Sequence, residues 1–162
     1  MKRMAVTMGD ASGVGPEIVL RRFADGDLGP DVVVYGDASI LRAGAELLGT
    51  SVAIHPVDSP DHALDDRLNV VDLALLETSD FTPRKLNPQA GAAARAYVEK
   101  ATLDALAGTV AGVVTLPMNK EATQASDPGF VGHTEMIAGL CGVQNFSMML
   151  TTPEVAVTHI ST

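Results

Sequence analysis

The sequence is poor in cysteine and aromatic residues. Cys141 is the one cysteine among 162 residues, tryptophan is absent, and aromatic residues make up 4%. A single cysteine excludes a framework of internal disulfides and favours a reducing compartment, so we expect a cytoplasmic protein. Because Cys141 stands in an apolar stretch, we expect it to be a small core residue.

Positive charge and long apolar runs are also scarce. Eleven lysines and arginines face 20 aspartates and glutamates, for a net charge of −9. This balance argues against a basic face for nucleic acid, and against binding to an anionic membrane surface. No apolar run approaches the roughly 18 residues of a membrane span. The N-terminus reaches Gly9-Asp10 too early for a signal peptide. We therefore expect a small-molecule partner, with neither nucleic acid nor membrane.

Apolar segments with strand and helix patterns alternate along the chain, which predicts an α/β fold. We expect a first α/β domain over residues 1–120 and the incomplete start of a second over 121–162. Asp37 or Ser39 could cap the second helix, and Thr134 the last one. The expected strands are 3–8, 31–35, 51–57, 68–73 and 110–116, with a hairpin of 146–150 and 155–160; the expected helices begin at Pro16 and cover 40–48, 90–107 and 134–141.

The first candidate motif is the glycine-rich stretch Gly9–Glu17, between an expected strand and helix. Such a turn can present backbone N–H groups to an anion beside a helix N-terminus. Its spacing matches neither the Rossmann fingerprint nor a P-loop. A tight turn that needs positive φ is an equally open reading.

The second motif, Thr115–Lys120, follows a buried strand. Ligands of open α/β sheets bind at that end of the strands, so Lys120 could contact a phosphate or carboxylate. A solvated lysine at a helix start is the alternative.

Two further stretches carry histidines. In Gly132–Glu135, His133 precedes an expected helix, where an anionic substrate is favoured; a structural histidine is the alternative. His159 lies on an expected strand near the end of the chain, but one histidine does not make a metal site. We interpret His55 and His62 as surface residues.

The order of these motifs resembles the PdxA family of 4-hydroxythreonine-4-phosphate dehydrogenases. The shared pattern is G-D-x-x-G-[IV]-G-P-E, then T-x-P-x-N-K after an alanine-rich helix, then G-H-T-E. It is more distantly similar to isocitrate and isopropylmalate dehydrogenases, which open with a related loop. The resemblance implies a subunit of α/β/α layers with the active site between two domains, and a homodimer in which both subunits contribute to each site.

The resemblance also implies an oxidoreductase that uses NAD or NADP and a divalent metal (Zn, Mg, Co or Mn). It implies that the substrate is a small phosphorylated hydroxy acid such as 4-hydroxythreonine 4-phosphate of pyridoxine biosynthesis. Oxidation can be followed by decarboxylation. The catalytic residues stay unassigned. The resemblance places His133, Thr134, Lys120 and Asn119 at the substrate, and Asp10, Gly13 and Gly15 in a loop that lines the cleft.

The resemblance assigns no metal ligand within the chain. The family's first ligand histidine would follow Thr162 directly, with His159 as a weak alternative. We therefore expect a truncated chain that is inactive alone. The Gly9-Asp10 opening is typical of the family branch acting on four-carbon sugar-acid phosphates or aromatic cis-dihydrodiols, so both substrates stay open. A non-catalytic, phosphate-binding fragment is the alternative outside enzymes.

Overall fold

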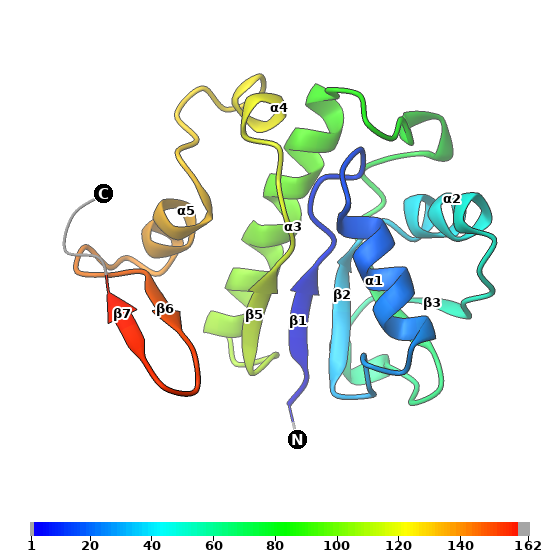
Figure 1. Ribbon diagram of the computed structural model, residues 1–162, viewed down its shortest axis with the longest axis horizontal. Coiled ribbons are helices and arrows are strands. Elements are labelled where there is room, and N and C mark those ends of the chain that lie inside the picture. Colours follow the sequence, from blue (N-terminus) through cyan, green and yellow to red (C-terminus); the bar gives the residue numbers. More distant parts are fainter. Residues whose placement is uncertain (1, 159–162) are drawn as a thin grey trace.

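A parallel β-sheet forms the centre of the protein (Figure 1). The computed structural model describes residues 2–158. Five strands pair in parallel in the order β3-β4-β2-β1-β5, and two more form a separate antiparallel hairpin. The strands are β1 (Met4–Thr7), β2 (Val32–Gly36), β3 (Ile54–Val57), β4 (Leu68–Asp72), β5 (Gly112–Thr115), β6 (Met149–Thr151) and β7 (Ala156–Thr158).

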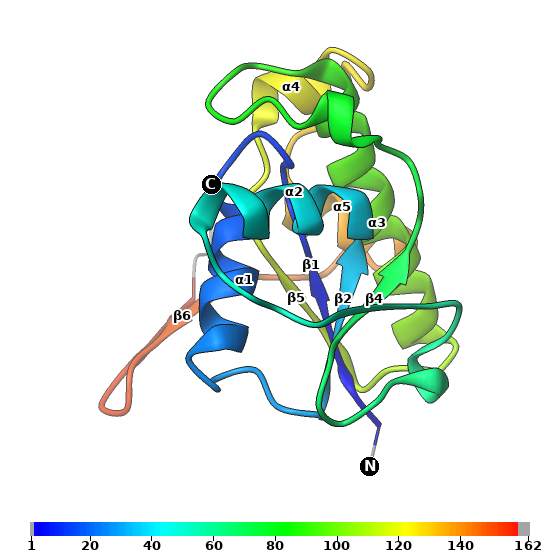
Figure 2. The same cartoon turned by 90° about the vertical axis from the view of Figure 1, so that its right-hand side faces the viewer.

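Helices cover both faces of the sheet, which gives three layers. Helices α1 and α2 lie on one face and α3 on the other (Figures 1 and 2). The predicted α/β fold is therefore confirmed. The helices are α1 (Gly15–Ala24), α2 (Ala38–Leu48), α3 (Pro88–Leu106), α4 (Lys120–Gln124) and α5 (His133–Leu140), with short 3-10 turns at Pro60–His62 and Thr78–Asp80.

Small residues let α3 pack closely on its neighbours. Its alanines Ala90, Ala94 and Ala101 are fully buried. A Cβ on Gly91 would lie 2.3 Å from the carbonyl carbon of Ala122 in α4, so only glycine permits this approach. Both α4 and α5 contact α3. The alanine-rich helix thus fixes the segment that follows β5.

The helix caps differ from the expected ones. Asp37 occupies the N-cap position of α2, but its carboxylate accepts hydrogen bonds from the Leu75 and Leu76 N–H groups and the Tyr97 hydroxyl instead. Ser39 donates to the Leu76 carbonyl. Burial of Asp37 favours several converging donors over one local cap, because an unpaired buried carboxylate is costly.

Three further expectations need correction. Cys141 is only half-buried, because it ends α5 at the margin of the fold. The third strand begins at Ile54, three residues later than expected. Helix α4 was not predicted; it is a single short stretch, too brief to show helical periodicity.

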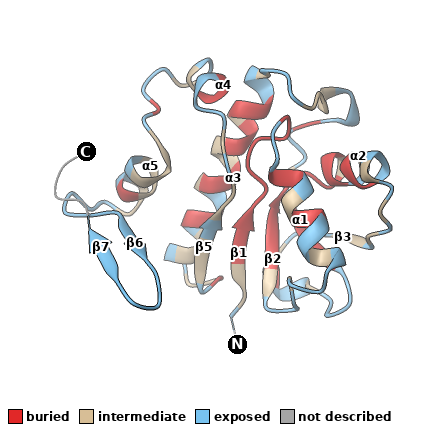
Figure 3. Ribbon diagram, viewed as in Figure 1, coloured by how far each residue is buried: buried red, intermediate tan, exposed pale blue. Residues whose placement is uncertain are grey.

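The hairpin was predicted, and β6 and β7 pair around residues 152–155. Every residue of both strands is exposed, as Figure 3 shows. Among residues 2–158, no helix is long and apolar enough to cross a membrane.

Candidate functional site

The strand order changes direction between β1 and β5. From β1 the chain passes to β2 on one side, while β5 later adds on the other side of β1. In open α/β sheets ligands bind at such a switch point, outside the carboxyl ends of the strands. The segment after β1 (the β1 loop, residues 8–14) and the segment after β5 (the β5 loop, residues 116–119) are therefore the candidate ligand-binding elements.

The β1 loop is held by its own hydrogen bonds. The Asp10 carboxylate accepts from the Ser12 N–H at 2.8 Å, and the Gly13 N–H donates to the Asp10 carbonyl at 3.0 Å. Asp10 is 4% exposed, and burial raises its pKa while the bond from Ser12 opposes that rise. The Asp10 side chain therefore stabilises the conformation of the β1 loop. The backbone of the loop places Asp10 at the candidate site.

Two glycines of the first motif are required by close packing. Gly9 has φ +72°, and its Cβ would lie 2.5 Å from the Pro117 carbonyl oxygen. A Cβ on Gly15 would lie 2.0 Å from the Met8 carbonyl oxygen. Gly13 has neither constraint, since its nearest atom would be at 3.4 Å. Gly9 thus fits the interpretation of this motif as a tight turn that needs positive φ. Gly15 instead allows α1 to pack closely on β1.

The β1 and β5 loops touch each other. The Asp10 N–H donates to the Pro117 carbonyl at 3.0 Å. Asn119 then caps α4, because its side-chain oxygen accepts from the Ala122 N–H at 3.0 Å. Lys120 is exposed and has no ion pair among residues 2–158. Asn119 and Lys120 are two of the four residues expected at the substrate; Asn119 has a structural role as a cap, and Lys120 has no ion pair among residues 2–158.

His133 joins this assembly from α5. Its ring hydrogen-bonds to the backbone of Leu116, directly after β5, while Nε2 is buried and has no partner among the described residues. The bond to Leu116 is assigned to Nδ1, because Nε2 has no partner among the described residues. Helix α5 begins at His133 with Gly132 as its uncapped N-cap, so the expected cap by Thr134 is wrong. Thr134 lies in the first turn, beside His133.

A second buried polar atom without a partner lies at the same strand ends. Among residues 2–158, Thr7 Oγ1 and His133 Nε2 are the buried side-chain atoms that lack hydrogen bonds. Thr7 ends β1 and is in register with Thr115, the last residue of β5. Buried polar groups are nearly always satisfied, so two exceptions close to one switch point set this end of the sheet apart from the rest of the described chain.

Burial lowers the pKa of His133, and the bond to Leu116 only partly opposes this. The unfolded chain then binds more protons than the folded one below the ordinary histidine pKa of about 6.5. The contribution of this group to folding is complete above that pH and falls as the pH drops towards the lowered pKa. In urea unfolding at several pH values, we expect His133→Gln to lose less stability on acidification than the wild type.

The exposed His62 offers the matched control. His62→Gln should keep the wild-type dependence of unfolding free energy on pH, because this side chain lies on the surface. Identical slopes for wild type and His133→Gln would contradict a buried, neutral imidazole at residue 133.

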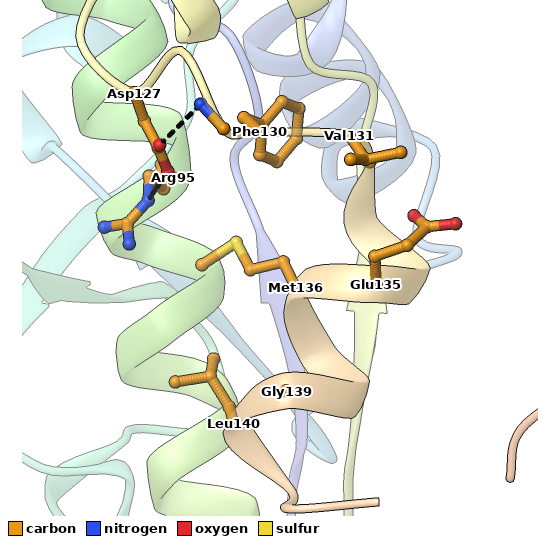
Figure 4. A pocket seen from close by; sticks show the side chains of 10 residues that line it. Arg95, Asp127, Phe130, Val131, Glu135, Met136, Gly139 and Leu140 are labelled. Atoms are coloured by element: carbon orange, nitrogen blue, oxygen red, sulfur yellow. Dashed lines mark hydrogen bonds and ion pairs between the residues drawn. The ribbon is translucent and has the colours of Figure 1, made fainter. Parts of the chain in front are cut away.

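A separate pocket of about 310 Å³ lies between α3 and α5 (Figure 4). Phe130, Met136 and Leu140 give it an apolar wall. At its edge Arg95 is already paired with Asp127 at 3.0 Å and with a glutamate of its own helix. Since its cation is neutralised and neither the β1 loop nor Lys120 lines it, this pocket is distinct from the candidate site.

Sequence reasoning missed the segment of residues 78–87, which lies against the β1 loop. The Arg84 N–H donates to the Ser12 carbonyl at 2.8 Å, and the Ser12 and Thr82 hydroxyls are 3.2 Å apart. Arg84 has φ +67°, which costs a non-glycine residue about 1–2 kcal/mol. Two consecutive cations, Arg84 and Lys85, in an acidic chain were the one sequence signal that could have found this segment.

Metal donors do not gather in the described part of the chain. Residues 2–158 contain no group of three histidine, cysteine, aspartate or glutamate side chains that could hold an ion. His159, the weak alternative ligand, lies outside the described residues. His133 alone is too few donors for a metal centre.

Sequence and structure both relate the chain to known proteins. It matches the family described as "Pyridoxal phosphate biosynthetic protein PdxA" over residues 29–162. A D-threonate 4-phosphate dehydrogenase of Pectobacterium atrosepticum is 36% identical over 99% of this chain and 51% of that protein. A 4-hydroxythreonine-4-phosphate dehydrogenase of Hydrogenobaculum sp. is 34% identical over 93% of this chain and 47% of that protein.

A solved structure agrees with these relatives. The crystal structure of 4-hydroxythreonine-4-phosphate dehydrogenase from Klebsiella pneumoniae superposes with a TM-score of 0.90 and 38% identity, covering 98% of this chain and 49% of that one. The chain spans about half the length of the relatives it matches. The match over residues 29–162 confirms the resemblance found from the motifs: this chain belongs to the PdxA family.

Proposed function

We propose that the protein carrying this chain is a dehydrogenase that oxidises a hydroxyl group of a small phosphorylated hydroxy acid. The observation that carries this proposal is the 36% identity to a D-threonate 4-phosphate dehydrogenase over 99% of the chain. The Gly9-Asp10 opening of the β1 loop favours a four-carbon sugar-acid phosphate over 4-hydroxythreonine 4-phosphate. An aromatic cis-dihydrodiol is the third candidate substrate.

The proposal includes NAD or NADP and a divalent metal ion. The nicotinamide would accept a hydride from the substrate carbon, which is the chemistry that this cofactor supplies. The described residues do not provide a metal ligand set, so the metal would need donors from outside residues 2–158. The roles proposed for the residues of this chain do not depend on the metal.

In this proposal the chain binds and orients the substrate. His133 is neutral, and its Nδ1–H is occupied by Leu116. Nε2 therefore offers a fixed lone pair that accepts a hydrogen bond from a substrate hydroxyl group. Lys120 supplies a positive charge near the β1 loop for the phosphate or carboxylate. Orientation of this kind can lower a reaction barrier by several kcal/mol.

A substrate panel tests the proposal directly. The protein that carries this chain is assayed for NADH or NADPH formation with D-threonate 4-phosphate, 4-hydroxythreonine 4-phosphate and an aromatic cis-dihydrodiol, each with several divalent metals. We expect turnover of a phosphorylated hydroxy acid, with D-threonate 4-phosphate the best substrate. Absence of turnover with both phosphorylated substrates would contradict the proposal.

The exposed apolar surface supports a homodimer or a covering second domain. Met149 and Leu150 of β6 are 58% and 56% exposed, and Val114 on the edge strand β5 is 47% exposed. Large apolar patches on a protein surface mark interaction sites. We propose that these exposed apolar side chains are covered by the remaining half of the family fold or by a second subunit.

We therefore expect the 162-residue chain, expressed alone, to self-associate and to bind a hydrophobic dye. Replacing Met149 and Leu150 by serine and threonine should reduce both effects, because it removes apolar area from exposed β6 without touching the core. Sedimentation velocity measures the association. The exposed Leu47→Ser in α2 is the control. A monomeric wild-type chain that binds no dye would contradict this view of the surface.

A further inference from the structure

Unpaired positive charge collects around the β1 loop. Ion pairs engage six of the 11 lysines and arginines. Among residues 2–158 the cations without an ion pair are Lys2, Arg42, Arg84, Lys85 and Lys120. The last three belong to the segment that precedes α3 and to the start of α4, and both of these lie at the end of the sheet where the parallel strands finish (Figures 1 and 2). The chain as a whole carries a net charge of −9.

Hydrogen bonds fix the segment that carries two of these cations. Arg84 is bonded through its N–H to Ser12, and the Thr82 hydroxyl lies 3.2 Å from that of Ser12. The Asn87 amide donates to the Thr82 hydroxyl at 3.3 Å and to the Asp80 carbonyl at 3.2 Å. The segment is irregular in shape but rigidly tied to the β1 loop.

Arg84 keeps an unfavourable backbone for an arginine. Its φ of +67° lies in the left-handed region that favours glycine. Glycine would form the same bond to Ser12 without strain, so the fold does not require an arginine side chain here. Strained residues of this kind concentrate at functional sites, so the strain is compatible with a binding role for the guanidinium group.

Nearby carboxylates do not neutralise these cations. The Asp10 carboxylate is buried and bound to the Ser12 N–H. The Asp80 carboxylate accepts from the Glu77 N–H. Across the β1 loop, Lys120 follows the β5 loop, which is bonded to Asp10 through Pro117. The β1 loop thus has cations on both sides.

We propose that Arg84 and Lys85, together with Lys120, bind a phosphoryl group of the ligand at the β1 loop. The inference deepens the proposed function and rests on it in one respect: the ligand carries phosphate. Guanidinium and ammonium groups are the usual partners of phosphate oxygens. The phosphoryl group could belong to the substrate's phosphate ester or to the diphosphate of the dinucleotide, and the two give different kinetics.

The test compares Arg84→Gly and Lys85→Ala with Arg84→Lys in the protein that carries this chain. Glycine fits the positive φ, so Arg84→Gly should melt at the same temperature as the wild type or higher. In the dehydrogenase assay we expect Arg84→Gly and Lys85→Ala to raise one KM at least about tenfold, and Arg84→Lys to restore most of it. A rise for the phosphorylated substrate assigns the substrate phosphate, and a rise for NAD or NADP assigns the diphosphate.

A second readout does not depend on activity. Inorganic phosphate and diphosphate should raise the melting temperature of the wild type, and this shift should shrink in Arg84→Gly and Lys85→Ala. Arg42→Ala, which removes an unpaired cation on α2, should behave as the wild type. If no dehydrogenase activity is found, the proposed function fails, and the melting shifts still decide the phosphate site. Unchanged KM values, or a wild type that neither anion stabilises, would overturn the inference.

Discussion

Gly15→Ala is expected to destabilise the protein by about 3 kcal/mol or more, because overpacking against rigid backbone lies at the upper end of such costs. The new Cβ would lie 2.0 Å from the Met8 carbonyl oxygen and 3.1 Å from its carbonyl carbon. Met8 is fully buried and its N–H is bonded to the Tyr35 carbonyl, so β1 cannot move aside. The helix α1 must then shift, and the β1 loop with it. Chemical denaturation measures the loss.

Gly13→Ala is the matched control within the same loop. Gly13 is exposed, and its nearest atom to a new Cβ would be the Asp10 carbonyl oxygen at 3.4 Å, an ordinary contact. We expect it to change the unfolding free energy by less than about 1 kcal/mol. Equal losses in the two variants would show that the close approach of α1 to β1 is not what fixes this loop.

His133→Ala is expected to raise the KM for the substrate strongly while the fold stays intact. Removing the imidazole leaves the bound hydroxyl group of the substrate without its acceptor, which costs about 1–3 kcal/mol and corresponds to roughly a 5–150-fold change in KM. The structural loss is smaller, because the ring makes one hydrogen bond to Leu116 and is half-buried. Steady-state kinetics on the proposed phosphorylated substrate provide the measurement.

Two variants separate binding from folding at this residue. His62→Ala removes an exposed histidine outside the site and should keep the wild-type KM. Circular dichroism of His133→Ala should match the wild type. Normal kinetics in a folded His133→Ala protein would contradict the assignment of this residue to the substrate.

Strong periodic segments were predictable from the sequence. The long alanine-rich α3 and the valine-rich β2 carry their burial in their own pattern. The positions of glycine and proline bounded most elements correctly, as with Gly49, which ends α2 in the left-handed conformation. Local sequence determines such features, so they can be read without knowing what packs nearby.

Features that depend on distant partners were not predictable. The Asp37 carboxylate was expected to cap its own helix, but it accepts a hydrogen bond from the Tyr97 hydroxyl, 60 positions away in the chain. The strain at Arg84 exists because its N–H reaches Ser12. The sequence motifs did point to the β1 loop and His133, but their common anchor, the Leu116-Pro117 backbone, carries no side-chain signal. The expected division at residues 120 and 121 into two domains stays a prediction.

The most direct test of the account is a structure of the protein with D-threonate 4-phosphate bound. We expect one ligand whose oxygen atoms lie within hydrogen-bond distance of His133 Nε2 and of the β1 loop. A ligand bound elsewhere, such as in the pocket between α3 and α5, with His133 Nε2 left without a partner, would contradict it.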